Sequence, residues 1–117
     1  MSQHKGRIAE DLARDYLLQQ GLRLRARNYR SRMGEIDLIM EDQQHLVFIE
    51  VRARRLDSFG DALESVTKAK QQKIMRTAAY YLQYHALSDR VPCRFDVVAV
   101  QGCPPTIHWV PNAFGLH

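Results

Sequence analysis

The segment that most restricts the fold is HLVFIEVRAR, residues 45–54, because it is apolar on both of its faces. Successive side chains of a strand point to opposite sides of the sheet. Leu46 and Phe48 therefore lie on one face, and Val47, Ile49 and Val51 lie on the other. A strand of this kind must be covered on both sides. The sequence predicts a central strand with helices against each face of its sheet.

Two segments have the three- and four-residue spacing of apolar side chains that is typical of a helix with one buried face. The first covers residues 5–20, and Gly21 ends it. The second runs to about residue 85 and begins either near Asp61 or with Thr67 as its N-cap. These two helices can supply the cover that the central strand needs.

Four further strands are predicted from alternating side chains or from short apolar runs between turn residues, at 22–28, 35–40, 94–100 and 106–110. The strand at 22–28 alternates strictly, with Leu22, Leu24 and Ala26 on one face and arginines on the other. The first three strands are expected to be consecutive and antiparallel. The order α-β-β-β-α-β-β in 117 residues predicts one α/β domain over residues 1–117, with a central mixed sheet flanked by helices.

Net charge and hydropathy indicate which partners and which cellular compartment to expect for this chain. A formal net charge of +4 and a sequence pI near 9.3 favour a polyanionic partner such as nucleic acid. The start of the chain has no apolar run for a signal peptide, and the longest apolar stretch is far too short to cross a bilayer. We therefore expect a cytoplasmic protein without a membrane partner, and we interpret Cys93 and Cys103 as reduced thiols.

Two carboxylates, Asp37 and Glu50, interrupt strands that are otherwise apolar. If those strands form a hairpin, the two side chains can lie side by side, where they repel each other unless a proton or a cation lies between them. Mg²⁺ prefers oxygen ligands and is usually held by one or two carboxylates with waters and phosphates. In the alternative interpretation, Asp37 ends a strand at the surface and Arg52 neutralises Glu50. The combination of the three residues favours a metal site.

These residues also carry a resemblance. Asp37 followed by Glu50-Val51-Arg52 resembles the D…(D/E)xK signature of the PD-(D/E)xK nuclease superfamily, with arginine in place of the lysine. An ordered set over nearly the whole chain resembles the YraN family of bacterial proteins: KGRIAE, Asn28, GEIDLI, FIEVRAR, Phe59-Gly60, Val66-Thr67, Lys70 and RFDVV. The resemblance implies a restriction-endonuclease-like fold. The family is also similar to archaeal Holliday-junction resolvases, which use a glutamate of the first helix, here Glu10.

The resemblance implies a Mg²⁺- or Mn²⁺-dependent endonuclease that hydrolyses phosphodiester bonds of DNA, with a branched or partly single-stranded substrate. Asp37, Glu50 and the backbone carbonyl of Val51 would hold the metal, with Glu10 acting through water. From helical spacing alone, an i, i+4 surface pair between Glu10 and Arg14 is an equally good interpretation. Resolvase-like cutting of two symmetric strands would also require a homodimer.

Arg52 departs from the family signature, because arginine does not lose its proton in proteins and so cannot act as a general base. Three accounts remain open. In the first, the charge of Arg52 is sufficient for catalysis. In the second, a lysine elsewhere in the chain takes the role of the signature lysine. In the third, the site binds DNA without cutting it. Lys70 is the candidate for the second account, since it falls on the apolar stripe of the second helix with Val66 and Ile74.

Arginines gather on both sides of the two carboxylates. Those expected to contact phosphates, which position nucleic acid without reading its sequence, are Arg25, Arg27, Arg30, Arg32, Arg54 and Arg55. A solvated strand face is the alternative for the first two. Tyr80, Tyr81 and Tyr84 are expected to pack or cap the second helix. Two other functions stay open, namely a nucleic-acid-binding module without catalysis and a protein-interaction domain on a nuclease scaffold.

Overall fold

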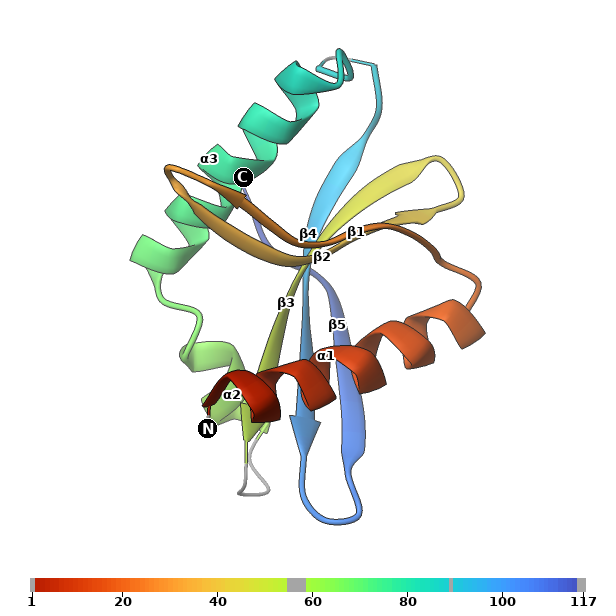
Figure 1. Ribbon diagram of the computed structural model, residues 1–117, viewed down its shortest axis with the longest axis vertical. Coiled ribbons are helices and arrows are strands. Elements are labelled where there is room, and N and C mark those ends of the chain that lie inside the picture. The colour runs from red at the N-terminus through yellow and green to blue at the C-terminus, as the bar shows by residue number, and fades with distance from the viewer. Residues whose placement is uncertain (1, 55–58, 89, 116–117) are drawn as a thin grey trace.

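The computed structural model describes residues 2–54, 59–88 and 90–115. Five strands form one sheet in sequence order: β1 (Arg23–Ser31), β2 (Gly34–Asp42), β3 (His45–Arg54), β4 (Cys93–Gln101) and β5 (Thr106–Phe114). Neighbouring strands are antiparallel except for β3 and β4, which are parallel (Figure 1). The predicted α/β class, with a mixed sheet flanked by helices, is confirmed.

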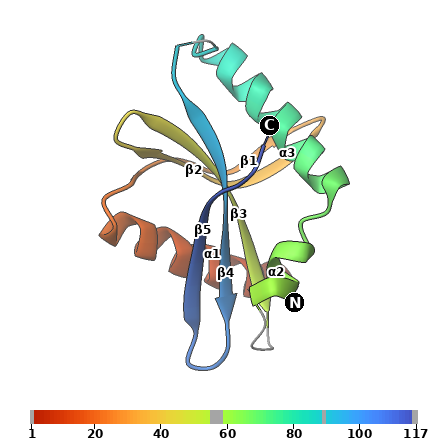
Figure 2. The same cartoon turned by 180° about the vertical axis from the view of Figure 1, so that it is seen from behind.

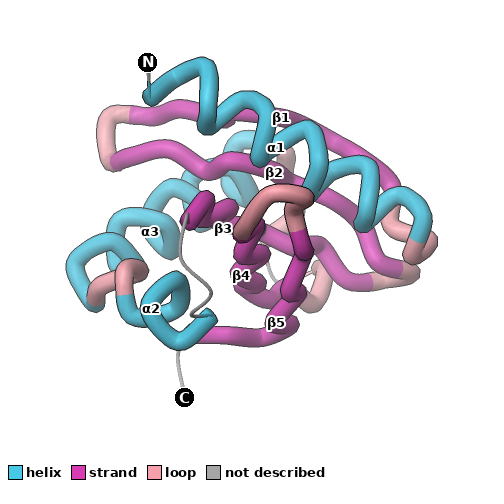
Figure 3. The backbone as a smooth tube through the Cα atoms, turned by 90° about the horizontal axis from the view of Figure 1, so that it is seen from below, coloured by secondary structure: helices cyan, strands magenta, loops and turns pink. Residues whose placement is uncertain are grey.

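The central strand β3 is covered on both faces, as its sequence predicts. On one face, Leu17 of α1 (Ser2–Gln19) lies in a buried cluster with Val47 and Ile49. On the other face, Ile74 of α3 (Lys68–Tyr84) lies in a buried cluster with Phe48. Figure 3 shows α1 and α3 on opposite sides of the sheet. Burying each such side chain contributes about 1.5–3 kcal/mol, so these two clusters hold the helices in place.

The second predicted helix is divided in two. A short helix, α2 (Phe59–Glu64), precedes α3, and Thr67 is the N-cap of α3. Its side-chain oxygen accepts a hydrogen bond from the backbone amide of Lys70 at 3.2 Å, which satisfies a donor that the first helical turn leaves unpaired. The two helix starts that the sequence left open, near Asp61 and at Thr67, thus correspond to the beginnings of α2 and α3. Within the described residues, no helix is long and apolar enough to span a membrane.

The strict alternation predicted for β1 is wrong. A register shift between Leu24 and Ala26 interrupts its pairing with β2. Leu22 is buried on the α1 side, Leu24 is 40% exposed, and Ala26 packs on the α3 side. An extra residue in one strand of a pair moves the following side chains to the opposite face. Side-chain alternation in the sequence alone does not reveal such a bulge.

The β1–β2 hairpin leaves β3 and packs on α3. Residues 38–42 of β2 pair with β3, whereas residues 34–36 of β2 pair with β1 alone. A Cβ atom at Gly34 would lie 3.3 Å from atoms of both Lys73 and Thr77, so glycine permits this close approach to α3. Ser31 also donates a hydrogen bond to Thr77. Figure 2 shows the hairpin and α3 together from behind. As a result, β2 and β3 separate at residue 37.

A fully buried carboxylate joins β4 to β5. Asp96 has no solvent exposure and accepts hydrogen bonds from Arg94 Nε at 3.1 Å, Trp109 Nε1 at 2.9 Å and the amide of Asn112 at 2.8 Å. Trp109 also packs edge to face against Tyr16 of α1. The charge of Asp96 is thus paired and hydrogen-bonded, as a buried charge must be.

Candidate functional site

Asp37 and Glu50 come together where β2 separates from β3. Leu38 and Ile49 form the last pair of that ladder, and the next residues outward are Asp37 and Glu50. The side chain of Asp37 accepts a hydrogen bond from the amide of Val51 at 2.8 Å. This bond replaces the backbone acceptor that β2 no longer provides, so the buried amide keeps a partner. The predicted proximity of the two carboxylates is confirmed, since their carboxyl groups interact directly.

Burial changes the acidity of both groups. Burial, followed by the negative charge of Glu50, raises the pKa of Asp37 to about 7, although the Val51 amide lowers it. Burial also raises the pKa of Glu50, against the opposing charges of Arg52 and Lys70. Two carboxylates in direct contact cannot both ionise easily, because their negative charges repel each other. Near neutral pH the pair therefore retains a proton, or it needs a cation in its place.

Arg52 forms an ion pair with Glu50 and is held in place by a second contact. Its Nη1 lies 3.1 Å from Glu50 Oε2, and its Nε donates to Ser65 Oγ at 2.8 Å. Ser65 in turn donates to the backbone carbonyl of Ala62 at 2.6 Å. The ion pair expected in the surface interpretation therefore exists. Arg52 lowers the pKa of Glu50, but burial and the charge of Glu50 still raise the pKa of Asp37.

Lys70 lies on the same side of the sheet as Arg52. The apolar stripe predicted for the second helix is confirmed at Val66 and Ile74, which are buried, but Lys70 is exposed at the beginning of α3. A long aliphatic stem allows lysine to carry its charge away from such a stripe. The charge of Lys70 still lowers the pKa of Glu50, so this side chain lies within electrostatic reach of the site.

Glu10 approaches from the opposite side, on α1. Its side chain is 15% exposed, lies 3.6 Å from Arg27 and forms a hydrogen bond with Asn28. Burial raises its pKa, and the charge of Asp37 raises it further. The structure therefore brings Glu10 into electrostatic contact with the paired carboxylates. In the sequence, only the family resemblance points to Asn28, and its hydrogen bond with Glu10 places it beside the site.

The alternative prediction, a surface pair between Glu10 and Arg14, is wrong. Arg14 pairs with its near neighbours Asp11 at 3.7 Å and Asp15 at 2.8 Å. Such pairs between partly exposed side chains contribute at most about 1 kcal/mol. The i, i+4 spacing therefore does not explain the position of Glu10.

The donor set fits a hard cation that keeps much of its water shell. In the part of the chain that the structure describes, no three His, Cys, Asp or Glu side chains form a ready group of ligands. Asp37 and Glu50 supply two carboxylates, and the backbone of Val51 lies beside them. Mg²⁺ is commonly held by one or two carboxylates, with waters and substrate phosphates completing its shell. These two residues would hold such an ion, and Glu10 would reach it only through water.

Half of the six arginines expected to bind nucleic acid are engaged with acidic side chains. Three form ion pairs: Arg25 with Glu41 at 2.8 Å, Arg27 with Asp11 at 2.7 Å and Arg30 with Glu35 at 3.2 Å. Arg32 is exposed, Arg54 donates to the carbonyl of Ala53, and Arg55 lies outside the described residues. A phosphate would have to compete with these carboxylates, so the strand face is less basic than the sequence suggests.

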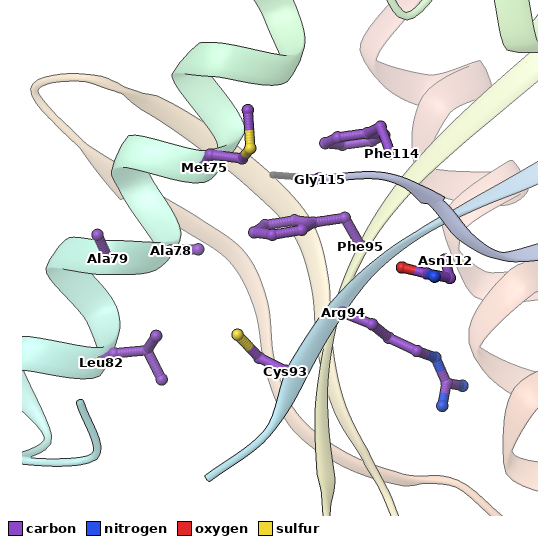
Figure 4. A pocket seen from close by; sticks show the side chains of 10 residues that line it. All are labelled: Met75, Ala78, Ala79, Leu82, Cys93, Arg94, Phe95, Asn112, Phe114 and Gly115. Carbon is purple, nitrogen blue, oxygen red and sulfur yellow. The ribbon is translucent and has the colours of Figure 1, made fainter. Parts of the chain in front are cut away.

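A separate pocket of about 390 Å³ lies between α3 and the strands β4 and β5 (Figure 4). Its lining is mainly apolar and includes Met75, Leu82, Phe95 and Phe114. The exposed free thiol of Cys93 also lines it, and Cys103 is free as well, as predicted. Asp37 and Glu50 are not among its lining residues, so the pocket is distinct from the carboxylate site.

Together, the fold and the site define an α/β protein whose mixed sheet holds two largely buried carboxylates where two strands separate. The chain belongs to the family described as Uncharacterised protein family UPF0102, which it matches over residues 9–100. The resemblance to the YraN family is thereby confirmed.

Relatives from several bacteria match almost the whole chain. A UPF0102 protein of Legionella pneumophila (strain Corby) is 46% identical over 97% of each chain. A UPF0102 protein of Nitrosococcus oceani is 52% identical over 94% of this chain and 90% of its own. A UPF0102 protein of Saccharophagus degradans is 48% identical over 100% of this chain and 99% of its own. These matches therefore extend over nearly the full length of the chain.

Proposed function

We propose that this protein is a Mg²⁺- or Mn²⁺-dependent DNA endonuclease of restriction-endonuclease-like architecture within the PD-(D/E)xK superfamily. The observation that carries the proposal is the largely buried Asp37–Glu50 pair, in which partial burial and mutual repulsion raise the pKa of Asp37 to about 7. A structural role alone gives no reason to bury two interacting carboxylates, because a neutral pair would be more stable. Strongly shifted acids of this kind are typical of functional sites.

The residues around the pair have distinct roles in the proposed reaction. A bound Mg²⁺ would lower the pKa of a coordinated water and neutralise charge on the phosphate. Arg52, oriented by Ser65, would hold a non-bridging phosphate oxygen through its fixed fork of donors. Glu10, whose pKa is raised, can accept a proton from water on the α1 side. Lys70 is exposed and free to follow the substrate.

The direct test is cleavage of labelled single-stranded, duplex and four-way-junction DNA by the wild-type protein with Mg²⁺, Mn²⁺ or EDTA. We expect products with either metal and none with EDTA, and a preference for the junction or the single strand. Asp37→Ala and Glu50→Ala should remove the products. Cleavage that persists in both variants would place the activity elsewhere, in a contaminant or a different site.

Two other outcomes would replace the proposal. DNA binding that weakens steeply with salt, without products in any metal, would identify a binding module that has lost catalysis. The absence of both binding and cutting would favour a protein-interaction domain.

The cation required by the reaction can be identified by comparing Arg52→Gln with Lys70→Gln. We expect Arg52→Gln to slow single-turnover cleavage about a hundredfold, the usual effect of removing one preorganised donor from a transition state. Lys70→Gln should slow it by about tenfold or less, because its side chain is exposed and unanchored. A larger effect of Lys70→Gln would assign the role of the signature lysine to Lys70. Arg52→Lys serves as the control that retains charge.

A further inference from the structure

One face of α3 carries a row of exposed basic and aromatic side chains. Its members are Lys70, Lys73, Tyr80 and Tyr84, and we call this row the α3 track. Their spacings of three, seven and four residues place them along the same side of a helix. Lysines lie at the beginning of the helix and tyrosines at its end. The track therefore offers cations near the carboxylate site and aromatic rings farther away.

The two tyrosines of the track are not needed for packing. The expectation that all three tyrosines of this helix pack or cap it is confirmed only for Tyr81, which is 3% exposed and contacts the core. Tyr80 is 46% exposed and Tyr84 is 72% exposed. Their rings stack on each other, with centroids 6.3 Å apart and planes inclined by 21°. Large exposed aromatic rings that adjoin each other are typical of an interaction surface.

The chemistry of the track fits a single strand of DNA. Every base has an aromatic face that stacks on tyrosine, and lysines attract the phosphates that link the bases. In a duplex these faces are covered by the neighbouring base pairs, so only unpaired bases can use the tyrosines. The net charge of +4 favours the same polyanionic partner.

Distances along the helix define the length of strand that would bind. At about 1.5 Å per residue, Tyr80 and Tyr84 lie about 15 and 21 Å from Lys70 along the axis. Lys70 acts electrostatically on Glu50, so it marks the site end of the track. Stacked nucleotides advance about 3.4 Å each, and this span corresponds to about four to six nucleotides.

We propose that the α3 track binds an unpaired segment of a DNA strand, with its bases stacked on Tyr80 and Tyr84 and its phosphates on Lys70 and Lys73. The part of this inference that leads the strand to Asp37 and Glu50 rests on the proposed function. Binding itself does not, because it requires neither metal nor catalysis. The substrate class of the enzyme would then be DNA that has a single-stranded segment next to the cleaved bond.

The test is the affinity for a short labelled oligothymidylate and for a duplex of the same length, measured by fluorescence anisotropy in EDTA. We expect the Tyr80→Ala/Tyr84→Ala variant to bind the single strand at least about tenfold more weakly. The Tyr80→Phe/Tyr84→Phe variant should stay within about twofold of the wild type, because the rings remain. Gln72→Ala/Gln83→Ala is the matched control, since both glutamines are exposed on α3 outside the track.

Salt dependence separates stacking from charge. The alanine variant of the tyrosines should keep the wild-type slope of affinity against salt. Lys73→Ala should reduce that slope by about 0.7, the value for one phosphate contact on a single strand. Thermal unfolding of each variant checks that the fold is intact.

Several outcomes would overturn the proposal that the α3 track binds an unpaired DNA strand. They are no binding of the oligothymidylate by the wild type, a twofold or smaller effect of the tyrosine variant, an equal loss of duplex binding, or much tighter binding of an oligouridylate. Tyrosine-dependent binding without any metal-dependent cutting would instead overturn the proposed nuclease and leave the track. Metal-dependent cutting that is unchanged in the tyrosine variant would overturn the proposed role of the α3 track and leave the proposed nuclease.

Discussion

Asp37→Asn is expected to cut DNA about a thousandfold more slowly than the wild type while being more stable in the absence of metal. The loss of rate follows because a metal contributes several kcal/mol to the transition state, and about 1.4 kcal/mol corresponds to a factor of ten. The gain in stability follows because asparagine removes one of two interacting buried charges and keeps an acceptor for the Val51 amide. Sites that sacrifice stability for function show this pattern.

The gain in stability should depend on pH in a defined window. The pKa of Asp37 is about 7 in the folded protein, against an ordinary value of 3.8. Between these values the folded state holds more protons than the unfolded state, so the stability of the wild type falls as pH rises from about 4 to about 7 and is then constant. The full shift would correspond to about 4 kcal/mol. Because the carboxyl pair is partly solvated, we expect about half of this advantage for Asp37→Asn at pH 8, and almost none near pH 4.

Urea unfolding at several pH values, with EDTA or with Mg²⁺, measures this effect. Asp15→Asn is the matched control, because it makes the same chemical change at a carboxylate that is 56% exposed. Mg²⁺ should stabilise the wild type and leave Asp37→Asn unchanged. If Asp37→Asn is no more stable than Asp15→Asn at pH 8, the acidity assigned to the pair is wrong. If Mg²⁺ stabilises both proteins equally, the metal does not bind at Asp37.

Asp96→Ala is expected to cause the largest loss of stability, about 3 kcal/mol or more. The carboxylate is fully buried and accepts hydrogen bonds from Arg94, Trp109 and Asn112. Removing one partner of a buried ion pair leaves the other charge and its donors without compensation. The free energy of unfolding in urea measures the loss.

Asp42→Ala provides the control for Asp96. Asp42 pairs with the same arginine at 2.9 Å, but its side chain is 29% exposed. Water can replace it, so we expect a loss of about 1 kcal/mol or less. Asp96→Asn should lie between the two, because it keeps the shape and one acceptor. Equal losses for Asp42→Ala and Asp96→Ala would mean that burial does not determine the contribution of this network.

The sequence predicts the central part of the fold well, because local pattern and tertiary position agree there. Residues 45–54 were predicted as the central strand, and β3 has these bounds. The proximity of Asp37 and Glu50 also follows from local rules, since a hairpin and side-chain alternation are enough to place them together. Residue type and position make Thr67 one of two candidate helix starts, and it is the N-cap of α3.

Features that depend on distant residues were missed. Two of the three partners of Asp96, Trp109 and Asn112, lie on the next strand, and alternation does not show that they would surround a carboxylate. Ser65 orients Arg52 across the gap between α2 and β3, and a single serine in a sequence carries no such signal. The exposure of Tyr80 and Tyr84 depends on where the β1–β2 hairpin ends over α3. Helical spacing suggests which side chains are neighbours but does not determine what covers them.

The separation of β2 from β3 also bears on the order in which the chain folds. Asp37 and Glu50 meet through one hairpin of adjacent strands, which closes a short loop and can form early. Lys70 and Ser65 belong to the crossover between β3 and β4, which are parallel, and such long-range pairing forms slowly. We therefore expect the two carboxylates to meet during folding before Lys70 and the serine that orients Arg52 are in place. A proton or a metal ion between the two carboxylates would lessen their repulsion during folding, and in the proposed reaction only the metal ion would remain there.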